Sequence, residues 1–166
     1  MKWRKAELAA AAFQEKRLIL SSRALGGLLR AVLDKGVPFR LRAHGRSMSP
    51  FIRDGDIITV VPCTGDSLRR GDVAAFIHPQ REGLVVHRVS GKAKDKIFLK
   101  GDNSHMSDGP VPRKDILGRV VRIERNGKKA FLGLGPERLL IPVLTRPGLR
   151  SCLRPLGKIL SHPKKV

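Results

Sequence analysis

Between residues 39 and 132 the chain alternates apolar and polar residues in short runs, and this period of two constrains the fold most. In residues 39–43, for example, Phe, Leu and Ala alternate with two arginines. Glycines separate the runs, as is typical of tight turns. Strands are therefore expected at residues 39–43, 56–61, 72–78, 84–90, 96–99, 116–124 and 128–132. Short strands at this spacing predict a mostly β chain with a compact antiparallel core, rather than alternating strands and helices.

The segments on either side of this region have different patterns. Residues 5–35 are expected to be helical, because apolar residues recur every three or four positions on one face of the second half: Leu25, Leu28, Leu29, Val32 and Leu33. Ser21 or Ser22 could cap that half, and Gly36 with Pro38 ends it. Such an amphipathic helix either packs on the β core or lies on a membrane surface or a partner. Prolines divide the residues after 132 into short pieces, so we expect a helical segment (1–36), a β domain (37–132) and a basic C-terminal tail (133–166).

The net charge of +20 is concentrated in the two flanks. Residues 1–46 hold 11 Lys/Arg and 3 Asp/Glu, and residues 119–166 hold 12 and 2. The central residues 47–118 hold 11 and 9, so they are almost neutral. Basic flanks attract anionic lipid headgroups, nucleic acid or acidic peptides through salt-sensitive fields. Charge alone does not choose among these partners, and a basic surface that is simply solvated is also compatible with it.

Neither a membrane span nor a metal site is expected from the sequence. No stretch approaches the roughly 18 to 20 apolar residues that span a bilayer. The basic N-terminus precedes only a short apolar run without a clear cleavage site. We therefore expect a cytoplasmic protein, with peripheral attachment to the inner face of the membrane as an alternative. Cys63, Cys152 and the five histidines lack the spacing of metal ligands, so neither a metal nor a cofactor is predicted.

A candidate nucleophile, Ser47, lies in the run Gly-Arg-Ser-Met-Ser-Pro at residues 45–50. It follows a predicted strand and is expected on a turn with its hydroxyl exposed. Gly45 allows close approach of another backbone, and Pro50 stiffens the loop. Gly45, Met48 and Pro50 are therefore the expected substrate-binding residues. A serine hydroxyl is a poor nucleophile unless a base removes its proton, so the loop alone could equally be a polar connection between strands.

His87 is the candidate base. Strand alternation puts it on one face with Val85 and Val89, and partial desolvation there favours the neutral imidazole that can accept a proton. Asp102 and Asp108 follow in a loop rich in Gly, Asn and Ser, and either could accept the second ring N–H. Each residue alone could be a core histidine or a turn aspartate. Their order, each within a short distinctive phrase, indicates acyl transfer to serine.

These phrases resemble the type I signal peptidases, specifically the archaeal and endoplasmic-reticulum type that uses Ser-His-Asp instead of the bacterial Ser-Lys pair. The similarity runs in order through residues 45–50, 53–56, 70–73, 86–89, 100–103 with Asp108, and 115–120. The resemblance implies that Ser47 is the nucleophile and that His87 is the general base at the position of the bacterial lysine. It also implies that Asp108 is the catalytic acidic residue, that Asp102 has a supporting role, and that the core is an all-β peptidase fold related to self-cleaving repressors.

The sequence departs from that family in three respects. Members usually carry a membrane-spanning N-terminal helix, for which the amphipathic helix and basic flanks could substitute as a peripheral anchor. Many relatives have a serine two residues before the nucleophile, where this chain has Gly45. The Ser47 backbone N–H is then the main inferred donor to the oxyanion. The basic C-terminal tail matches nothing in the family pattern.

We therefore expect a serine endopeptidase that cleaves a leader or signal peptide of a preprotein after a small residue, a preference implied by the resemblance. The peptide is expected to add as an extended strand beside the Ser47 loop. Two alternatives are a DNA-binding self-cleaving regulator and a non-catalytic scaffold that binds peptides or membranes. Nucleic acid is the less expected partner, because the self-cleaving relatives have lysine where His87 stands and residues 1–46 offer too few helices for a helix-turn-helix.

Overall fold

The computed structural model describes residues 21–144. Helix α2 (Ser22–Leu33) comes first, and the remainder consists mainly of strands. The strands are β1 (Phe39–Arg42), β2 (Ile57–Pro62), β3 (Val73–Ile77), β4 (Leu84–Ala93), β5 (Lys96–Lys100), β6 (Ser107–Pro112), β7 (Ile116–Arg125) and β8 (Lys128–Lys129). Two 3-10 turns, η1 (Arg113–Asp115) and η2 (Pro136–Leu139), and the short helix α3 (Ile141–Leu144) complete it. The first half of the helix expected at 5–35 falls outside the described residues.

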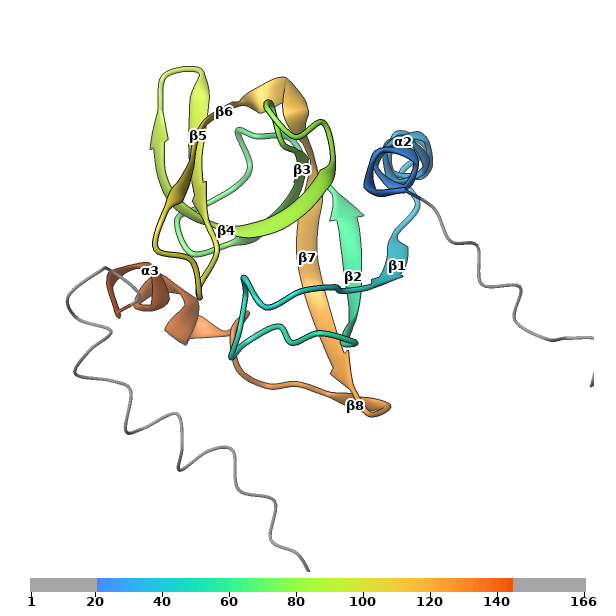
Figure 1. Ribbon diagram of the computed structural model, residues 1–166, viewed down its shortest axis with the longest axis vertical. Helices are drawn as coiled ribbons and strands as arrows, with labels where there is room; N and C mark the ends of the chain where they lie inside the picture. Colours follow the sequence, from blue (N-terminus) through green and yellow to red (C-terminus); the bar gives the residue numbers. More distant parts are fainter. Residues whose placement is uncertain (1–20, 145–166) are drawn as a thin grey trace, which may run out of the picture.

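The strands form one antiparallel sheet in the order β1-β2-β7-β3-β4-β5-β6, with β8 paired to β7. The fold class predicted from the sequence, mostly β, is therefore confirmed. Register shifts between Thr59 and Val60 in β2, and between Val89 and Gly91 in β4, bend the sheet as bulges do. Figure 1 shows the resulting curvature, with α2 on one side of the sheet and α3 on the other. Strands β1 and β6 form its two edges.

One strand was not expected from the sequence. Residues 107–112 form β6, although the stretch from Asp102 to Asp108 was predicted to be a loop. The strand contains Gly109, Pro110 and Pro112, which are typical of turns, and prolines are tolerated here because β6 is an edge strand. The expected strand at 128–132 is also shorter, since β8 ends at Lys129.

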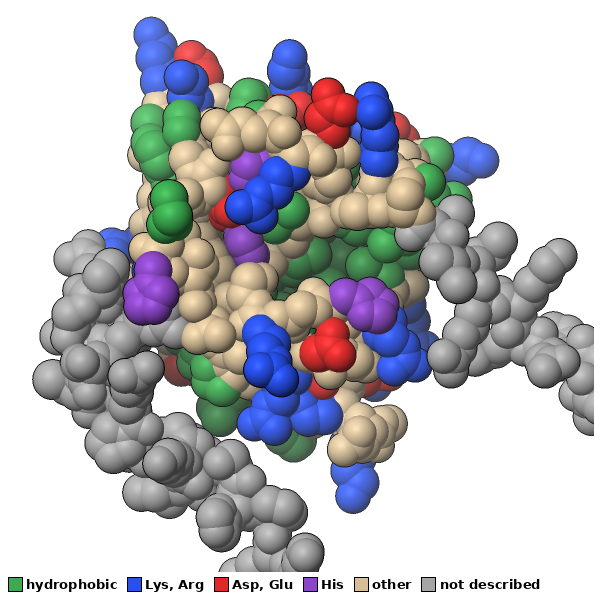
Figure 2. All heavy atoms as spheres, in the orientation of Figure 1, with side chains coloured by type: hydrophobic (Ala, Val, Ile, Leu, Met, Phe, Trp, Pro, Cys, Tyr) green, Lys and Arg blue, Asp and Glu red, His purple; other side chains and the backbone are tan. Residues whose placement is uncertain are grey.

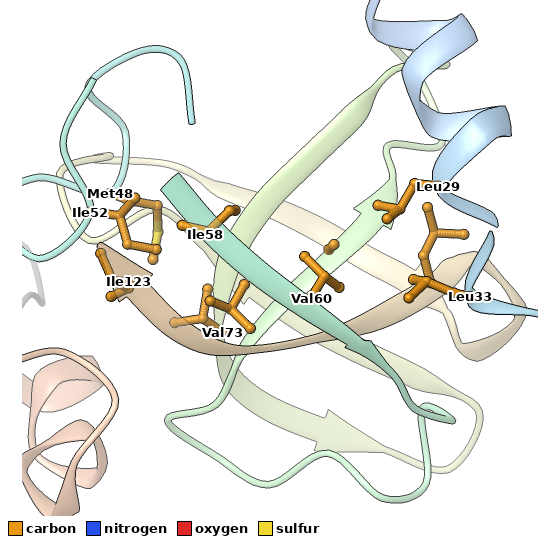
Figure 3. Packing of buried hydrophobic residues seen from close by; sticks show 11 residues of the cluster. Leu29, Leu33, Met48, Ile52, Ile58, Val60, Val73 and Ile123 are labelled. Atoms are coloured by element: carbon orange, nitrogen blue, oxygen red, sulfur yellow. The ribbon is translucent and has the colours of Figure 1, made fainter. Parts of the chain in front are cut away.

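The main hydrophobic cluster lies between α2, the inner strands and the Ser47 loop. Figure 3 shows Leu29 and Leu33 at one end of it and Met48 with Ile52 at the other, with side chains of β2 between them. Helix α2 begins at the cap Ser21, whose hydroxyl accepts the Ala24 N–H at 3.2 Å. The described part of the predicted amphipathic helix therefore packs on the β core. A second cluster fills the curve of β3, β4, β5 and β6.

A buried arginine joins the segment after β8 to the sheet. Arg88 of β4 donates to both Asp102 carboxylate oxygens at 2.8 and 2.7 Å and to the carbonyls of Gly71 and Gly133 at 2.8 Å. Arg138 adds an ion pair to Asp72 at 3.3 Å. Residues 133–144 are thus held against the β core, while the domain boundaries given above stay a prediction. Within residues 21–144, no helix combines the length and apolar character needed to cross a bilayer.

Candidate active site

Ser47 lies on a turn directly after the edge strand β1, as predicted. The turn is fixed from both sides. On one side the Gly45 N–H donates to Asp54 Oδ1 at 2.8 Å. Gly45 also has a φ of 91°, a backbone conformation that residues with a side chain rarely adopt. On the other side Met48 is buried in the core and its carbonyl accepts the Ile52 N–H at 3.0 Å. Ser47 is exposed between these anchors, so its hydroxyl is open to a substrate.

His87 comes from the middle of β4 and reaches the serine. Its Nε2 lies 2.9 Å from Ser47 Oγ, and the imidazole is buried against the ring of Phe76, 6.2 Å between centroids. Val85 and Val89 pack in the second cluster, on the face that carries His87, as strand alternation predicted. Because β4 is paired on both sides, by β3 and β5, the imidazole projects from a rigid part of the sheet.

Asp108 is the carboxylate that the structure brings to His87. Its Oδ2 lies 2.5 Å from His87 Nδ1, and only about a tenth of its side chain is exposed. A carboxylate at Nδ1 places the ring proton there and leaves the Nε2 lone pair free to accept the Ser47 proton. Ser47, His87 and Asp108 therefore form one continuous hydrogen-bonded series from three separate elements.

Asp102 has a different partner, so it does not contact His87 directly. Both of its carboxylate oxygens accept from Arg88 in the buried pair described above. Burial raises the pKa of the Asp102 carboxyl, and the Arg88 hydrogen bonds and charge oppose that shift. Since a guanidinium remains charged at any ordinary pH, the pair is ionic and supports the loop behind the site. Reasoning from the residues alone leaves Asp102 and Asp108 as alternatives for the imidazole, and only the family resemblance points to Asp108.

The loop after β5 also controls the position of the serine, which sequence reasoning missed. The Asn103 N–H donates to the Ser47 carbonyl at 2.6 Å. At Gly101, an added Cβ would lie 2.7 Å from the Ser47 carbonyl oxygen and 3.1 Å from His87 Nε2. Glycine is therefore required for this close approach, and its presence beside Asp102 in the family phrase was the available signal.

A second histidine was also missed. His78, directly after β3, is buried with its Nε2 3.9 Å from Asp108 Oδ1. No motif contains it, and it follows a strand without any distinctive spacing, so the sequence alone gave no reason to place it at the site.

The triad opens into a cleft of about 600 Å³. Figure 2 shows the hollow, with hydrophobic side chains inside it and histidines at its border. Its apolar lining comes from α2, β1, β2, β4, the Ser47 loop and the segment before β6: Leu25, Leu41, Ala43, Met48, Ile52, Ile58, Leu84, Val85, Val86 and Met106. Of the expected substrate-binding residues, Gly45 and Met48 line the cleft. Pro50 is exposed and does not line this cleft, so its role in substrate binding stays a prediction.

The groups present suit acyl transfer to serine. Within the part of the chain that the structure describes, no cluster of three His, Cys, Asp or Glu side chains is arranged to hold a metal ion. A hydroxyl, an imidazole and a carboxylate in series can activate the alcohol by proton transfer.

A curved antiparallel sheet with this series at the mouth of an apolar cleft defines a serine peptidase. The comparisons agree: the chain belongs to the Peptidase S24-like family, whose model matches residues 14–121. That family includes signal peptidase I and the self-cleaving repressors, so the resemblance seen in the sequence is confirmed at family level. A comparison with curated proteins gives no match.

Proposed function

We propose that this chain is a signal-peptidase-like serine endopeptidase that cleaves a leader or signal peptide of a preprotein after a small residue. The observation that carries the proposal is the hydrogen-bonded series Ser47–His87–Asp108 at the mouth of an apolar cleft. A self-cleaving regulator with these residues would attack a peptide bond within its own chain, so the experiment below distinguishes the two.

The reaction follows from the geometry. Ser47 Oγ attacks the scissile carbonyl carbon while its proton passes to His87 Nε2, at 2.9 Å in the resting site. Asp108 stays ionised, holds the Nδ1 proton and stabilises the imidazolium. The C–N bond then breaks, and the leaving amine takes the proton from Nε2. Water hydrolyses the acyl-enzyme by the same proton path, and the Ser47 backbone N–H is the proposed donor to the oxyanion.

The substrate is expected to bind as an added strand. Strand β1 pairs only with β2 among the described strands, and its residue Leu41 and the following Ala43 line the cleft beside the nucleophile. An extended peptide along this edge would form main-chain hydrogen bonds, with alternate side chains directed into the apolar cleft. The preference for a small residue before the cut comes from the family resemblance.

The test is cleavage of a proteome-derived peptide library by the full chain, with the new termini mapped by mass spectrometry. Ser47→Ala should lower the rate at least about a thousandfold without loss of fold, because no other group supplies the nucleophile. Ser49→Ala is the matched control and should cleave normally, since Ser49 lies outside the cleft lining. Peptide cleavage by Ser47→Ala would overturn the proposal. Cuts confined to the protein's own chain, at a rate independent of protein concentration, would favour the self-cleaving regulator.

We also propose that an anionic membrane surface is where the enzyme meets its substrate. Support comes from exposed apolar side chains between residues 131 and 143, led by Phe131 at 85% and Leu140 at 62%. They lie within residues 119–166, which hold 12 Lys/Arg and 2 Asp/Glu. Apolar side chains among basic ones suit the boundary between anionic headgroups and acyl chains.

A further inference from the structure

His78 and His87 approach different carboxylate oxygens of Asp108, the acidic member of the triad. Its Nε2 lies 3.9 Å from Asp108 Oδ1, whereas His87 Nδ1 contacts the other oxygen, Oδ2, at 2.5 Å. The His78 side chain is only 5% exposed. The two imidazoles also share a neighbour, because the Phe76 ring lies 6.3 Å from His78 and 6.2 Å from His87. The carboxylate of Asp108 is thus flanked by two held rings.

The backbone decides which nitrogen of His78 carries the proton. Its Nδ1 accepts the backbone N–H groups of Gln80 at 3.1 Å and Arg81 at 3.3 Å. A ring nitrogen that accepts hydrogen bonds has no proton of its own, so the hydrogen of the neutral ring is on Nε2. That Nε2–H is on the ring nitrogen that lies 3.9 Å from Asp108 Oδ1. The turn is closed further by the Glu82 N–H, which donates to the His78 carbonyl at 2.9 Å.

The regular pairing of β6 with β5 is interrupted at Asp108, so side-chain contacts contribute to the position of its carboxylate. Asp108 lies on the edge strand β6, in the irregular stretch between the Lys100–Ser107 and Phe98–Pro110 pairs. The next residue, Gly109, has a φ of 77°. The regular ladder therefore does not set the direction of this carboxylate, and a group at each oxygen is needed to hold it.

We propose that His78 is a positioning residue, which directs its Nε2–H to Oδ1 of Asp108 and so keeps Oδ2 aimed at His87. This inference rests on the proposed peptidase function and adds a fourth side chain to its machinery. At 3.9 Å the resting contact is electrostatic, and hydrogen bonds in unliganded active sites tighten as the reaction complex forms. Hydrogen bonds to charged groups correspond to about a tenfold effect or more on a rate that depends on them.

Two substitutions separate positioning from simple closure of the turn. In His78→Gln the amide nitrogen replaces Nε2 and keeps a donor for Asp108. In His78→Asn the amide oxygen replaces Nδ1 and keeps only the acceptor for the turn. We expect His78→Asn to lower kcat about tenfold or more with KM unchanged, and His78→Gln to stay within about threefold of the wild-type kcat. The reverse order, with Asn active and Gln impaired, would mean that His78 only closes the turn and would overturn the proposal.

A second measurement is independent of turnover. The His87 Nδ1 proton in its hydrogen bond to Asp108 should give a low-field proton resonance, identified by its loss in Asp108→Asn. We expect this resonance to move upfield in His78→Asn and to stay in place in His78→Gln. An unchanged resonance in both variants, or none in the wild type, would refute the positioning role. If the resonance responds but no peptide is cleaved, the proposed function fails while the positioning role stands.

Discussion

At the scale of single residues, the site depends on how closely the backbone after β5 approaches the nucleophile. The Asn103 N–H holds the Ser47 carbonyl at 2.6 Å, and Gly101 lies where any side chain would press on both Ser47 and His87. Arg88 and Asp102 fix this loop from behind through their buried pair. Removing one partner of such a pair typically costs about 3–5 kcal/mol, so the loop is held firmly.

Gly101→Ala should therefore impair catalysis more than folding. The new methyl would lie 2.7 Å from the Ser47 carbonyl oxygen and 3.1 Å from His87 Nε2, so the Ser47 backbone and the imidazole must shift away from it. A misplacement of about 1 Å can cost about a hundredfold in rate, and we expect a fall in kcat of that order. The measurement is peptide cleavage together with thermal unfolding.

Gly91→Ala is the matched control, because its added Cβ would meet nothing closer than Phe98 Cδ2 at 3.8 Å. Equal peptide cleavage by the two alanine variants would show that the close approach at Gly101 is not needed for catalysis.

The sequence predicted these residues unevenly, for physical reasons. Ser47 and His87 were identified because each lies in a distinctive sequence motif. The turn that holds Ser47 and the strand that holds His87 could also be predicted from the neighbouring residues alone. Local patterns could not separate Asp102 from Asp108, which only the family resemblance distinguished, since the fold decides which carboxylate meets Arg88 and which meets His87. His78 could not be predicted as a site residue for the same reason. It approaches Asp108 only because of how the strands pair, and that pairing cannot be deduced from the sequence.

At the scale of elements, alternation predicted most strands because a sheet with one buried face requires a period of two. It failed at β6, where Gly109, Pro110 and Pro112 resemble a turn and the edge position removes the need for a full ladder. Helical periodicity placed α2 correctly but put Leu28 on the apolar face, whereas it is 42% exposed. The face that packs consists of Gly26, Leu29 and Leu33.

Truncation of leucines on α2 tests how this helix packs. Leu29 has no exposed surface and lies in the main cluster, so Leu29→Ala should lower the free energy of unfolding by about 2–5 kcal/mol. Leu28→Ala should change it by less than about 0.5 kcal/mol. Denaturant titration measures both values. A similar loss in the two variants would contradict the packed face assigned here.

At the scale of the whole molecule, an almost neutral catalytic core is set between two basic flanks, and the buried Arg88 ties part of the C-terminal flank to that core. Its guanidinium bridges Asp102 beside the active site and the Gly133 carbonyl of the C-terminal segment. A surface that docks through residues 131–143 would thus be fixed relative to the cleft. This arrangement suits an enzyme whose peptide substrates lie at a membrane surface.

The proposed membrane contact can be tested with vesicles of defined composition. The full chain should co-sediment with vesicles containing phosphatidylserine and much less with pure phosphatidylcholine, and added salt should weaken the binding, because each Lys or Arg near an anionic surface contributes about 1 kcal/mol. Phe131→Ser combined with Leu140→Ser should weaken binding by about tenfold or more, since burying such side chains contributes about 1.5–3 kcal/mol each.

The control for this experiment is Val121→Ser, which removes an exposed apolar side chain of β7 outside the segment 131–143. It should bind vesicles as the wild type does. If the double variant also binds normally, the contact is purely electrostatic and the apolar segment has no part in it. Duplex DNA and anionic vesicles both attract basic side chains, but only the lipid can also bury exposed apolar side chains. Tighter binding to duplex DNA than to anionic vesicles at the same salt concentration would therefore make nucleic acid the partner of the basic flanks.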